Sequence, residues 1–294
     1  MHNSLDLVMW TFNGAKTLNT VLSRINKVIP KEYVNKRFII DDNSSDDTIA
    51  IAKLNGWKVC LNKGKGISDG ANTALEYVSS KIFCSFEQDI ILSEDWWIKV
   101  ALPFLGSNYA VASGLRFNSK PCGVNNLLKY NTQKKCVGEA WNNLKDSGAF
   151  LFGKTLDNTI YRTQMIRLIG GFPNFGANAG IDLVLACALE KYNLKWKVNY
   201  GVHSIHLRNG LKDELHHQRW YGMQREIING ELSKYDVNRS NKKFRSIISL
   251  FVPPVRGVQA AVAMKDATIC YIYPMIRFYY IWGIIKEMPK MRLK

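Results

Sequence analysis

Two carboxylates, Glu87 and Asp89, close an apolar stretch that begins at residue 81. The apolar run predicts a strand buried on both faces, with the two acids at its carboxyl end. Residues two apart on a strand point the same way, so we expect both carboxylates on one side of the chain. Buried carboxylates are costly unless a positive charge neutralises them. A Mg²⁺ or Mn²⁺ ion carrying a nucleotide diphosphate would supply that charge, and the alternative is a solvated strand end whose acids pair with lysines.

The composition limits the class of protein. The chain has 294 residues and a formal net charge of +16, which indicates an anionic partner such as nucleic acid, acidic lipid or a phosphorylated substrate. Its six cysteines form no CxxC pair, so small buried apolar side chains in a reducing compartment are favoured over disulfides or a zinc site. No signal peptide is expected, because Asp6 interrupts a short first apolar run.

Strand and helix patterns alternate along the N-terminal part. Apolar runs at 5–10, 36–40, 57–61 and 81–86 predict strands, with helices predicted at 15–29, 48–55 and 68–79. This order predicts an α/β fold with a mostly parallel sheet and helices on both faces. Ligands bind beyond the carboxyl ends of such strands. Four polar segments fall at that edge: residues 11–14, 41–47 and 63–66, and Glu87 with Asp89.

The polar segments together resemble a known family. The motifs VMWTFNG (8–14), FIIDDNSSDDT (38–48), NKGKGISDGANTAL (62–75) and FEQDI (86–90) resemble the family 2 glycosyltransferases of the GT-A fold, over about residues 5–225. The resemblance implies a Rossmann-like nucleotide-sugar-binding domain that uses Mn²⁺ or Mg²⁺. It also implies that Thr11, Asn13, Asp41 and Asp42 hold the nucleotide. The alternative for residues 41–47 is a turn and helix-capping cluster.

Two departures from the family pattern concern the diphosphate. The family's metal motif Asp-x-Asp stands here as Glu87-Gln88-Asp89, so the resemblance assigns the metal to Asp89 and donor contacts to Glu87 and Gln88. The family often carries an arginine where this chain has Ala71. We expect donor contacts from Lys65 and Asp69 in the same segment, with Lys63 as a second candidate cation; a solvated loop is the alternative.

A third departure concerns the catalytic base. The family opens a later helix with two acids, of which the second is the base of inverting members; here Ile181 replaces the first and Asp182 keeps the second. Asp182 would take the proton of an acceptor hydroxyl that attacks the anomeric carbon of the sugar. The alternative is an acid that only stabilises a helix N-terminus.

Three later residues complete the expected site. The resemblance gives His206 a metal or diphosphate role, with His203 as the second choice. The run HHQRWYG (216–222) partly matches a family signature, so Arg219 is expected to bind a phosphate and Trp220 to stack on a sugar. For each of these residues the alternative is a purely structural role, such as lining an amphipathic helix.

The C-terminal part differs in character. We divide the chain into a GT-A domain at 1–232 and a C-terminal region at 233–294. This region begins with a basic linker at 234–245 and continues as amphipathic helices. Pro274 is expected to break or kink the second of these helices. Aromatic side chains mixed with Lys and Arg, and a basic end at Lys290, Arg292 and Lys294, suit a membrane interface. Packing on the catalytic domain or on a second copy is the alternative. A flap is expected at 118–143 and a small-residue strand at 147–153.

The sequence therefore predicts a metal-dependent inverting glycosyltransferase, peripheral at the cytoplasmic face of a membrane. It would move a hexose from a UDP- or GDP-sugar to a lipid-linked or membrane-held acceptor, without binding nucleic acid. A polyprenyl-phosphate sugar synthase is the first alternative. The others are a nucleic-acid-binding protein, suggested by the charge, and a non-catalytic binder of nucleotide sugars.

Overall fold

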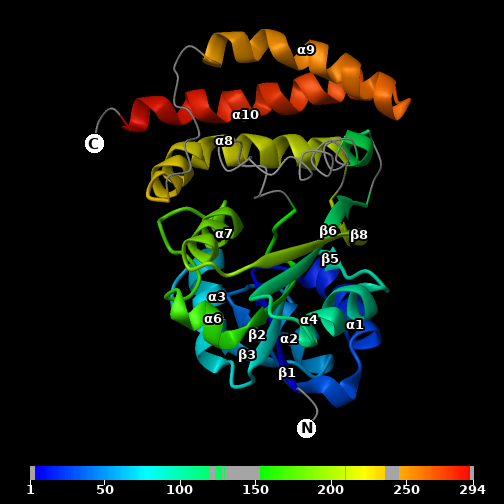
Figure 1. Cartoon of the computed structure of the whole chain (residues 1–294), viewed down its shortest axis with the longest axis vertical. Coiled ribbons are helices and arrows are strands. Elements are labelled where there is room, and N and C mark those ends of the chain that lie inside the picture. Colours follow the sequence, from blue (N-terminus) through cyan, green and yellow to red (C-terminus); the bar gives the residue numbers. More distant parts are fainter. Residues whose placement is uncertain are drawn as a thin grey trace. The chain divides into compact units, whose positions relative to one another are not determined.

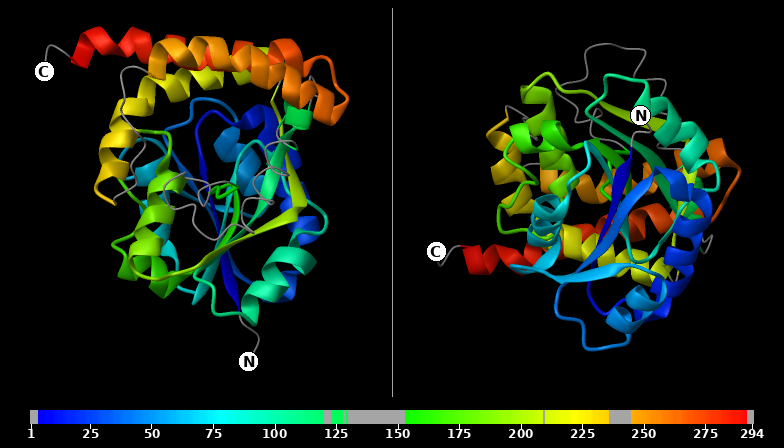
Figure 2. Two further views of the ribbon diagram at one scale, coloured as in Figure 1. Left: turned by 45° about the horizontal axis from the view of Figure 1, so that its top comes forward. Right: turned by 90° about the horizontal axis from the view of Figure 1, so that it is seen from below.

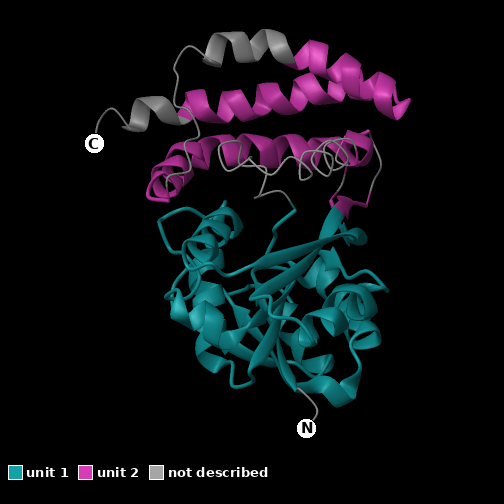
Figure 3. Ribbon diagram, in the orientation of Figure 1, with its two compact units in different colours: residues 1–116, 153–207 teal, residues 117–152, 208–294 magenta. Residues whose placement is uncertain are grey.

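The computed structural model describes residues 4–119, 123–127, 129, 153–208, 210–235 and 245–291, without the side chains of 245–252 and 287–291. The chain forms two compact units, one of Met1–Arg116 with Gly153–Leu207 and one of Phe117–Phe152 with Arg208–Lys294 (Figure 3). The second unit begins N-terminal to the predicted boundary after residue 232. The reason is that helix α8 (Leu211–Ser233) packs against helix α10 (Ile269–Met291).

The first unit is built on a mixed eight-stranded sheet with the order β3-β2-β1-β4-β7-β6-β8-β5. The first four strands are β1 (Leu5–Thr11), β2 (Val34–Asp41), β3 (Lys58–Leu61) and β4 (Ile82–Glu87), and they are parallel as predicted. The later strands, β5 (Ile90–Ile91), β6 (Val111–Asn118), β7 (Asn158–Arg162) and β8 (Trp196–His206), add antiparallel pairs. The register pairs Thr11 with Asp41 and Trp10 with Glu87, so the polar strand ends share one edge.

Helices cover both faces of this sheet (Figure 1). Helix α1 (Ala15–Val28) buries the predicted stripe of Leu18, Val21, Leu22 and Ile25 on one face. That face is also covered by α2 (Thr48–Leu54), the π-helical turn η2 (Trp97–Ala101) and α4 (Leu102–Leu105). The opposite face carries α3 (Gly66–Tyr77) and α6 (Thr163–Leu168). Short helix η1 (Lys31–Tyr33) and helix α7 (Ile181–Lys191) complete the unit.

One buried carboxylate fixes the amino-terminal ends of β1 and β4, at the edge of the sheet opposite the polar strand ends. Asp6 on β1 is 0% exposed. It accepts hydrogen bonds from the backbone N–H groups of Ser79 (2.7 Å) and Ser80 (2.9 Å), from the Ser80 hydroxyl (3.0 Å) and from the Asn35 amide (2.9 Å). Ser79 and Ser80 lead from α3 into β4, so Asp6 fixes the start of β4 beside β1.

We expect Asp6→Ala to lower the free energy of unfolding by about 3 kcal/mol, because the buried backbone N–H and hydroxyl of Ser80 and the part-buried N–H of Ser79 lose their acceptor. Urea denaturation followed by circular dichroism measures the change. Asp47→Ala is the control, since Asp47 is exposed and its side chain caps no helix, and it should cost less than about 0.5 kcal/mol. Equal effects of the two substitutions would contradict a structural role for Asp6.

The second unit is helical. Helix α10 packs against both α8 and α9 (Arg245–Met264), and Figure 2 shows α9 and α10 side by side. Gly222 and Gly283 allow α8 and α10 to touch: a Cβ added to Gly222 would lie 2.0 Å from the Tyr280 carbonyl oxygen. Contrary to the expected break, α10 continues through Pro274. Pro274 has no N–H for the Cys270 carbonyl, and the small Gly257 of α9 packs against that carbonyl.

Some sequence predictions concern residues that the structure does not describe. These are most of the predicted flap at 118–143, the predicted strand at 147–153 except Gly153, and positions 236–244 of the predicted linker. The side chains of Lys290, Arg292 and Lys294 also lie outside the described set. Within the described part of the chain, the helices lack the combination of length and apolar character needed to span a bilayer.

Candidate active site

A cavity of about 210 Å³ opens at the carboxyl ends of β1, β2 and β4. All four predicted polar segments supply lining residues, and the segment after β3 does so through Gly66. The lining residues are Trp10, Thr11, Phe12, Asp42, Asn62, Gly66, Ile67, Glu87, Gln88 and Asp89. The cavity therefore lies at the sheet edge where the strand order predicts a ligand site.

The structure separates the roles of Asp41 and Asp42. Asp41 is 1% exposed, and its carboxylate accepts hydrogen bonds from the Thr11 hydroxyl (3.1 Å) and from the backbone N–H of Ser44 (2.8 Å). Asp42 lines the cavity and accepts hydrogen bonds from Gly66 N–H (2.8 Å) and the Asn62 amide (3.2 Å). Asp41 thus shapes the loop, and Asp42 is the acid of the two that a ligand in the cavity would meet.

Asn13 and Lys65 lie in loops around the cavity and Asp69 in the first turn of α3, and none of the three is among the lining residues. The Asn13 side chain accepts a hydrogen bond from the backbone N–H of Ser45 (2.9 Å). Asp69 accepts from the backbone N–H of Lys65 (2.9 Å) and from the Asn174 amide (2.7 Å), so it connects the start of α3 to the residue before the helix and to Asn174. Their donor contacts stay a prediction. Lys63, the other candidate cation, pairs with Glu76.

Gln88 has a role that the sequence did not reveal. Its amide accepts a hydrogen bond from Phe12 N–H (2.9 Å) and donates one to the Phe12 carbonyl (3.0 Å). This two-point contact holds the loop after β1 against the turn after β4. Gly14 makes room for it, since an added Cβ would lie 2.4 Å from the Gln88 side-chain oxygen.

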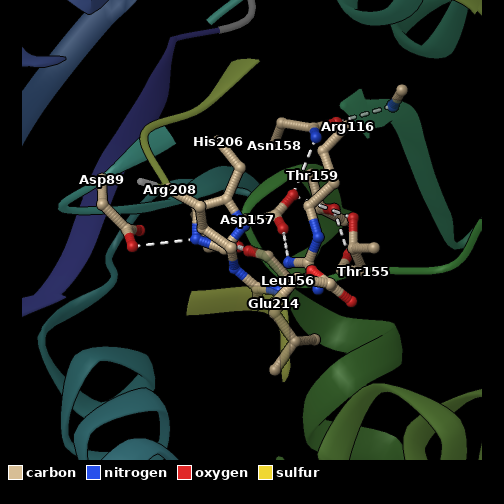
Figure 4. Close-up of polar contacts among 12 residues, drawn as sticks. Asp89, Arg116, Thr155, Leu156, Asp157, Asn158, Thr159, His206, Arg208 and Glu214 are labelled. Atoms are coloured by element: carbon tan, nitrogen blue, oxygen red, sulfur yellow. Dashed lines mark hydrogen bonds and ion pairs between the residues drawn. The ribbon is translucent and has the colours of Figure 1, made fainter. Parts of the chain in front are cut away.

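Asp89 and His206 meet although 117 residues separate them in the chain. The Asp89 Oδ2 and His206 Nε2 atoms are 2.9 Å apart (Figure 4). His206 ends β8, which pairs with β5 just after Asp89, and Leu207 N–H donates to the Asp89 carbonyl (2.8 Å). β4 ends at Glu87, so Asp89 lies in the following turn and not, as predicted, on the same strand face. His203, the second choice, is exposed on β8.

The Asp89–His206 pair offers one carboxylate oxygen and one imidazole nitrogen, both suitable for a divalent metal ion. Among the described residues no group of three or more His, Cys, Asp or Glu side chains is arranged to hold a metal. The pair is therefore an open site that would leave most coordination positions to other ligands.

Asp182 lies in the first turn of α7, two residues after Gly180, whose φ of 76° suits glycine. Its carboxylate accepts a hydrogen bond from Leu183 N–H (2.9 Å). Burial raises the pKa of Asp182 to about 6, while the Arg116 guanidinium opposes this rise. Burial also raises the pKa of Glu87, and Asp157, Asp89 and Asp182 add to the rise because their negative charges act on it.

Arg116 and Asp157 form an ion pair that sequence reasoning missed (Figure 4). Asp157 is 0% exposed, and its other carboxylate oxygen accepts hydrogen bonds from the Thr155 hydroxyl (2.9 Å) and the Asn158 amide (2.8 Å). The available signal was the position of Arg116 at the end of a run of small and apolar residues at 110–115. The partner lies about 40 residues away, beyond any local pattern.

Arg219 and Trp220 lie on α8, in the second unit. The Arg219 guanidinium covers the Trp282 ring of α10 at 4.1 Å from its centroid. Trp220 lies against Tyr221 at 5.2 Å and His217 at 5.9 Å between ring centroids. The Arg219 contact joins two packed helices, whereas the Trp220 contacts lie within α8, and a donor role for either residue stays a prediction.

The fold agrees with comparisons to known proteins. A family model described as glycosyl transferase family 2 matches residues 6–168. The match covers more than half of the chain, which therefore belongs to glycosyl transferase family 2, as the motifs predicted. No curated protein sequence matches the chain.

Solved structures confirm the predicted GT-A fold. A mannosyltransferase from Pyrobaculum calidifontis, solved with GDP-Man and Mn²⁺, is 13% identical with a TM-score of 0.59, and the match covers 97% of this chain and 86% of that one. Glucosyl-3-phosphoglycerate synthase from Mycobacterium tuberculosis, solved with Mn²⁺, UDP and glucosyl-3-phosphoglycerate, is 14% identical with a TM-score of 0.56 and 82% of each chain covered. The same enzyme with Mg²⁺ and UDP is 13% identical with a TM-score of 0.57, covering 82% and 81%.

Proposed function

We propose that this chain is a metal-dependent, inverting glycosyltransferase that moves a hexose from a UDP- or GDP-sugar to a lipid-linked or membrane-held acceptor. The contact that carries the proposal is the Asp89–His206 pair, 2.9 Å between Oδ2 and Nε2, with Asp89 at the cavity. The ligands of the similar solved structures, UDP or GDP-Man with Mn²⁺ or Mg²⁺, support this choice of donor and metal.

The residues present suit a diphosphate-bound Mn²⁺ or Mg²⁺. Asp89 and His206 would hold the ion, and diphosphate oxygens and water would supply its remaining ligands. When bound, the ion stabilises the negative charge that develops on the departing diphosphate. Asp42 and Thr11 border the same cavity and would contact the nucleoside.

Asp182 would act as the general base. With a pKa raised to about 6 by burial, its carboxylate is ionised at neutral pH and still accepts a proton more readily than an ordinary aspartate. It would take the proton of the acceptor hydroxyl as that oxygen bonds to the anomeric carbon and the bond to the diphosphate breaks. A single displacement of this kind inverts the anomeric centre.

The test is a panel of UDP- and GDP-sugars, each with Mn²⁺ or with EDTA, followed by melting temperature. One donor class should raise the Tm by several degrees only with metal, since a ligand that binds only the folded state stabilises it. Product analysis with that donor and lipid-linked sugar acceptors then measures transfer. Absence of stabilisation by any donor, or an equal effect in EDTA, would contradict the proposal.

The acceptor class rests on two exposed apolar stripes of the second unit. Side chains three or four residues apart lie on one helix face. On α9 the stripe is Val255, Val258 and Val262, and on α10 it is Tyr271, Met275, Phe278, Trp282 and Ile285, with exposures from 37% to 74%. Helix α10 already packs against α8 and α9, so this stripe is the part of its surface left exposed.

The basic residues near these stripes favour a lipid surface as the partner that covers them. Between residues 253 and 286 the chain carries Arg256, Lys265, Arg277 and Lys286, against a single acid, Asp266. Asp266 is engaged by the Thr268 hydroxyl (2.6 Å) and the Asn126 amide (2.9 Å). Exposed aromatic side chains beside basic ones suit anionic headgroups, and the proposed location is the cytoplasmic face of a membrane.

Flotation with vesicles of phosphatidylglycerol and phosphatidylcholine tests this surface. The chain should float with anionic vesicles, and the Tyr271→Glu/Phe278→Glu variant should bind at least about tenfold more weakly, because each buried aromatic contributes about 1.5–3 kcal/mol. Ile98→Glu, a substitution of an exposed residue on η2, is the control and should bind as wild type does. Failure to float, together with dimerisation that the double variant abolishes, would instead identify a second copy as the occupant.

A further inference from the structure

Gln88 precedes Asp89 in the turn after β4, and its side-chain amide reaches across to the loop after β1. The amide oxygen accepts a hydrogen bond from the Phe12 N–H (2.9 Å), and the amide nitrogen donates one to the Phe12 carbonyl (3.0 Å). One side chain thus binds both polar backbone groups of Phe12. Phe12 and Gln88 line the same cavity. The turn that carries the proposed metal ligand therefore also holds part of the cavity wall.

The loop after β1 has a conformation that needs such support. Asn13 has a φ of 48°, in the left-handed region that residues other than glycine seldom adopt. On one side this loop is bound to the loop after β2: Asn13 N–H donates to the Ser44 hydroxyl (2.9 Å), and the Asn13 side chain accepts from Ser45 N–H (2.9 Å). On the other side Gln88 holds Phe12, which is 56% exposed and so has little packing of its own.

Gly14 leaves the space that the Gln88 amide occupies. A Cβ added to Gly14 would lie 2.4 Å from the Gln88 side-chain oxygen and 2.7 Å from the carbon of its amide. The φ of Gly14 is −98°, which any residue adopts, so alanine at this position would disturb the flexible Gln88 side chain and not the backbone. Gly14 is not among the lining residues. The chain thus offers a way to displace the Gln88 amide without changing a residue that lines the cavity.

We propose that Gln88 is a positioning residue for the nucleoside of the donor and acts through Phe12. The inference rests on the proposed function, in which Thr11 and Asp42 contact the nucleoside. Phe12 directly follows Thr11, so the hydrogen bonds from Gln88 act on the nucleoside end of the cavity. Without them this part of the loop would have to become ordered when the donor binds, and ordering one residue costs about tenfold in affinity.

The metal and diphosphate end is held by other contacts. Asp89 Oδ2 lies 2.9 Å from His206 Nε2, and the Asp89 carbonyl accepts a hydrogen bond from Leu207 N–H (2.8 Å). These partners belong to β8 and to the residue after it, and they do not involve the loop after β1. Loss of the Gln88–Phe12 contact should therefore weaken binding of the nucleoside and leave binding of the metal-bound diphosphate unchanged.

Calorimetric titration of the full chain with two probes, both in the presence of Mn²⁺, separates the two ends. One probe is the nucleoside diphosphate, UDP or GDP, that stabilises the wild type, and the other is inorganic pyrophosphate, which has no nucleoside. Gln88→Met keeps the length of the side chain and loses both hydrogen bonds. It should raise the Kd of the nucleotide about tenfold or more and change the Kd of pyrophosphate by less than about twofold. Gly14→Ala should show the same pattern.

The double variant Gly14→Ala/Gln88→Met tests whether both substitutions act on one contact. If they do, their effects do not add, and its Kd for the nucleotide should lie within about twofold of that of the weaker-binding single variant. Gly106→Ala is the control. Gly106 is exposed, has a φ of −88°, and an added Cβ would meet no heavy atom within 4 Å, so this variant should bind both probes as wild type does.

Equal losses of nucleotide and pyrophosphate affinity would overturn the inference, because they would indicate damage to the whole cavity. Unchanged nucleotide affinity in the single variants, or effects that add in the double variant, would do the same. If Gln88→Met does not fold, the comparison of the two probes in Gly14→Ala decides. Failure of the proposed function appears separately, as a wild type that binds neither UDP nor GDP, whereas failure of this inference leaves nucleotide binding by the wild type intact.

Discussion

Replacing Asp182 by Asn is expected to lower kcat for transfer to a hydroxyl acceptor by about 10²- to 10⁴-fold, the usual contribution of a general base. Asparagine keeps the size of the side chain and cannot accept the proton. Donor affinity should change by less than about twofold, because no donor contact is assigned to this residue. Initial rates under saturating donor and a calorimetric titration of the donor measure the two quantities separately.

The pH dependence of the wild-type enzyme follows from the same carboxylate. Burial raises the pKa of Asp182 to about 6, and only the deprotonated form can act as base. We therefore expect kcat/KM to be constant above about pH 7 and to fall about tenfold per pH unit well below pH 6. Asp182→Asn should lack this limb. Rates across pH 5 to 8 in buffers of constant ionic strength provide the measurement.

Asp95→Asn is the matched control, because Asp95 is exposed and pairs with Lys99 on the surface. It should keep wild-type rates and the wild-type pH profile. An Asp182→Asn enzyme with nearly full activity would contradict the assignment of the base. It would favour the polyprenyl-phosphate sugar synthase, whose phosphate acceptor needs no proton removed.

Asp89→Ala is expected to abolish metal-dependent donor binding and to reduce transfer by about 10³-fold or more. The substitution removes the carboxylate of a two-residue set, whereas even changes in residues that only support metal ligands cost about 10- to 100-fold in affinity. The rise of Tm with donor and Mn²⁺ should disappear at all accessible concentrations. Mn²⁺ titration monitored by electron paramagnetic resonance, with UDP present, measures the loss directly.

A second variant separates this effect from damage to the fold. His206→Gln retains a polar group against Asp89 and should weaken metal affinity by about tenfold or more. Without ligand, Asp89→Ala and wild type should melt within a few degrees of each other, since the exposed fraction of the Asp89 side chain is 37%. Full donor stabilisation of Asp89→Ala by Mn²⁺ would disprove a metal site at the end of β4.

The sequence alone determined the first four strands and the edge at which they end. Apolar runs bounded by turn residues are local signals, and the right-handed crossover between parallel strands brings their carboxyl ends to one edge. Thr11, Asp42, Glu87 and Asp89 could therefore be assigned to one site from local patterns and strand order. The resemblance to the family placed Asp182 at the start of a helix, and the structure has it in the first turn of α7.

Only the tertiary structure decided which side chains meet. The antiparallel pairing of β5 with β8 brings His206 to Asp89, and the pairing of β6 with β7 brings the segment of Asp157 to Arg116. Whether Asp41 or Asp42 faces the cavity depends on how the loop after β2 folds back on Thr11. Such contacts join residues that are far apart in the chain, and their partners are selected by packing over the whole sheet. Local periodicity encodes which face of an element is buried and carries no information about which distant residue covers it.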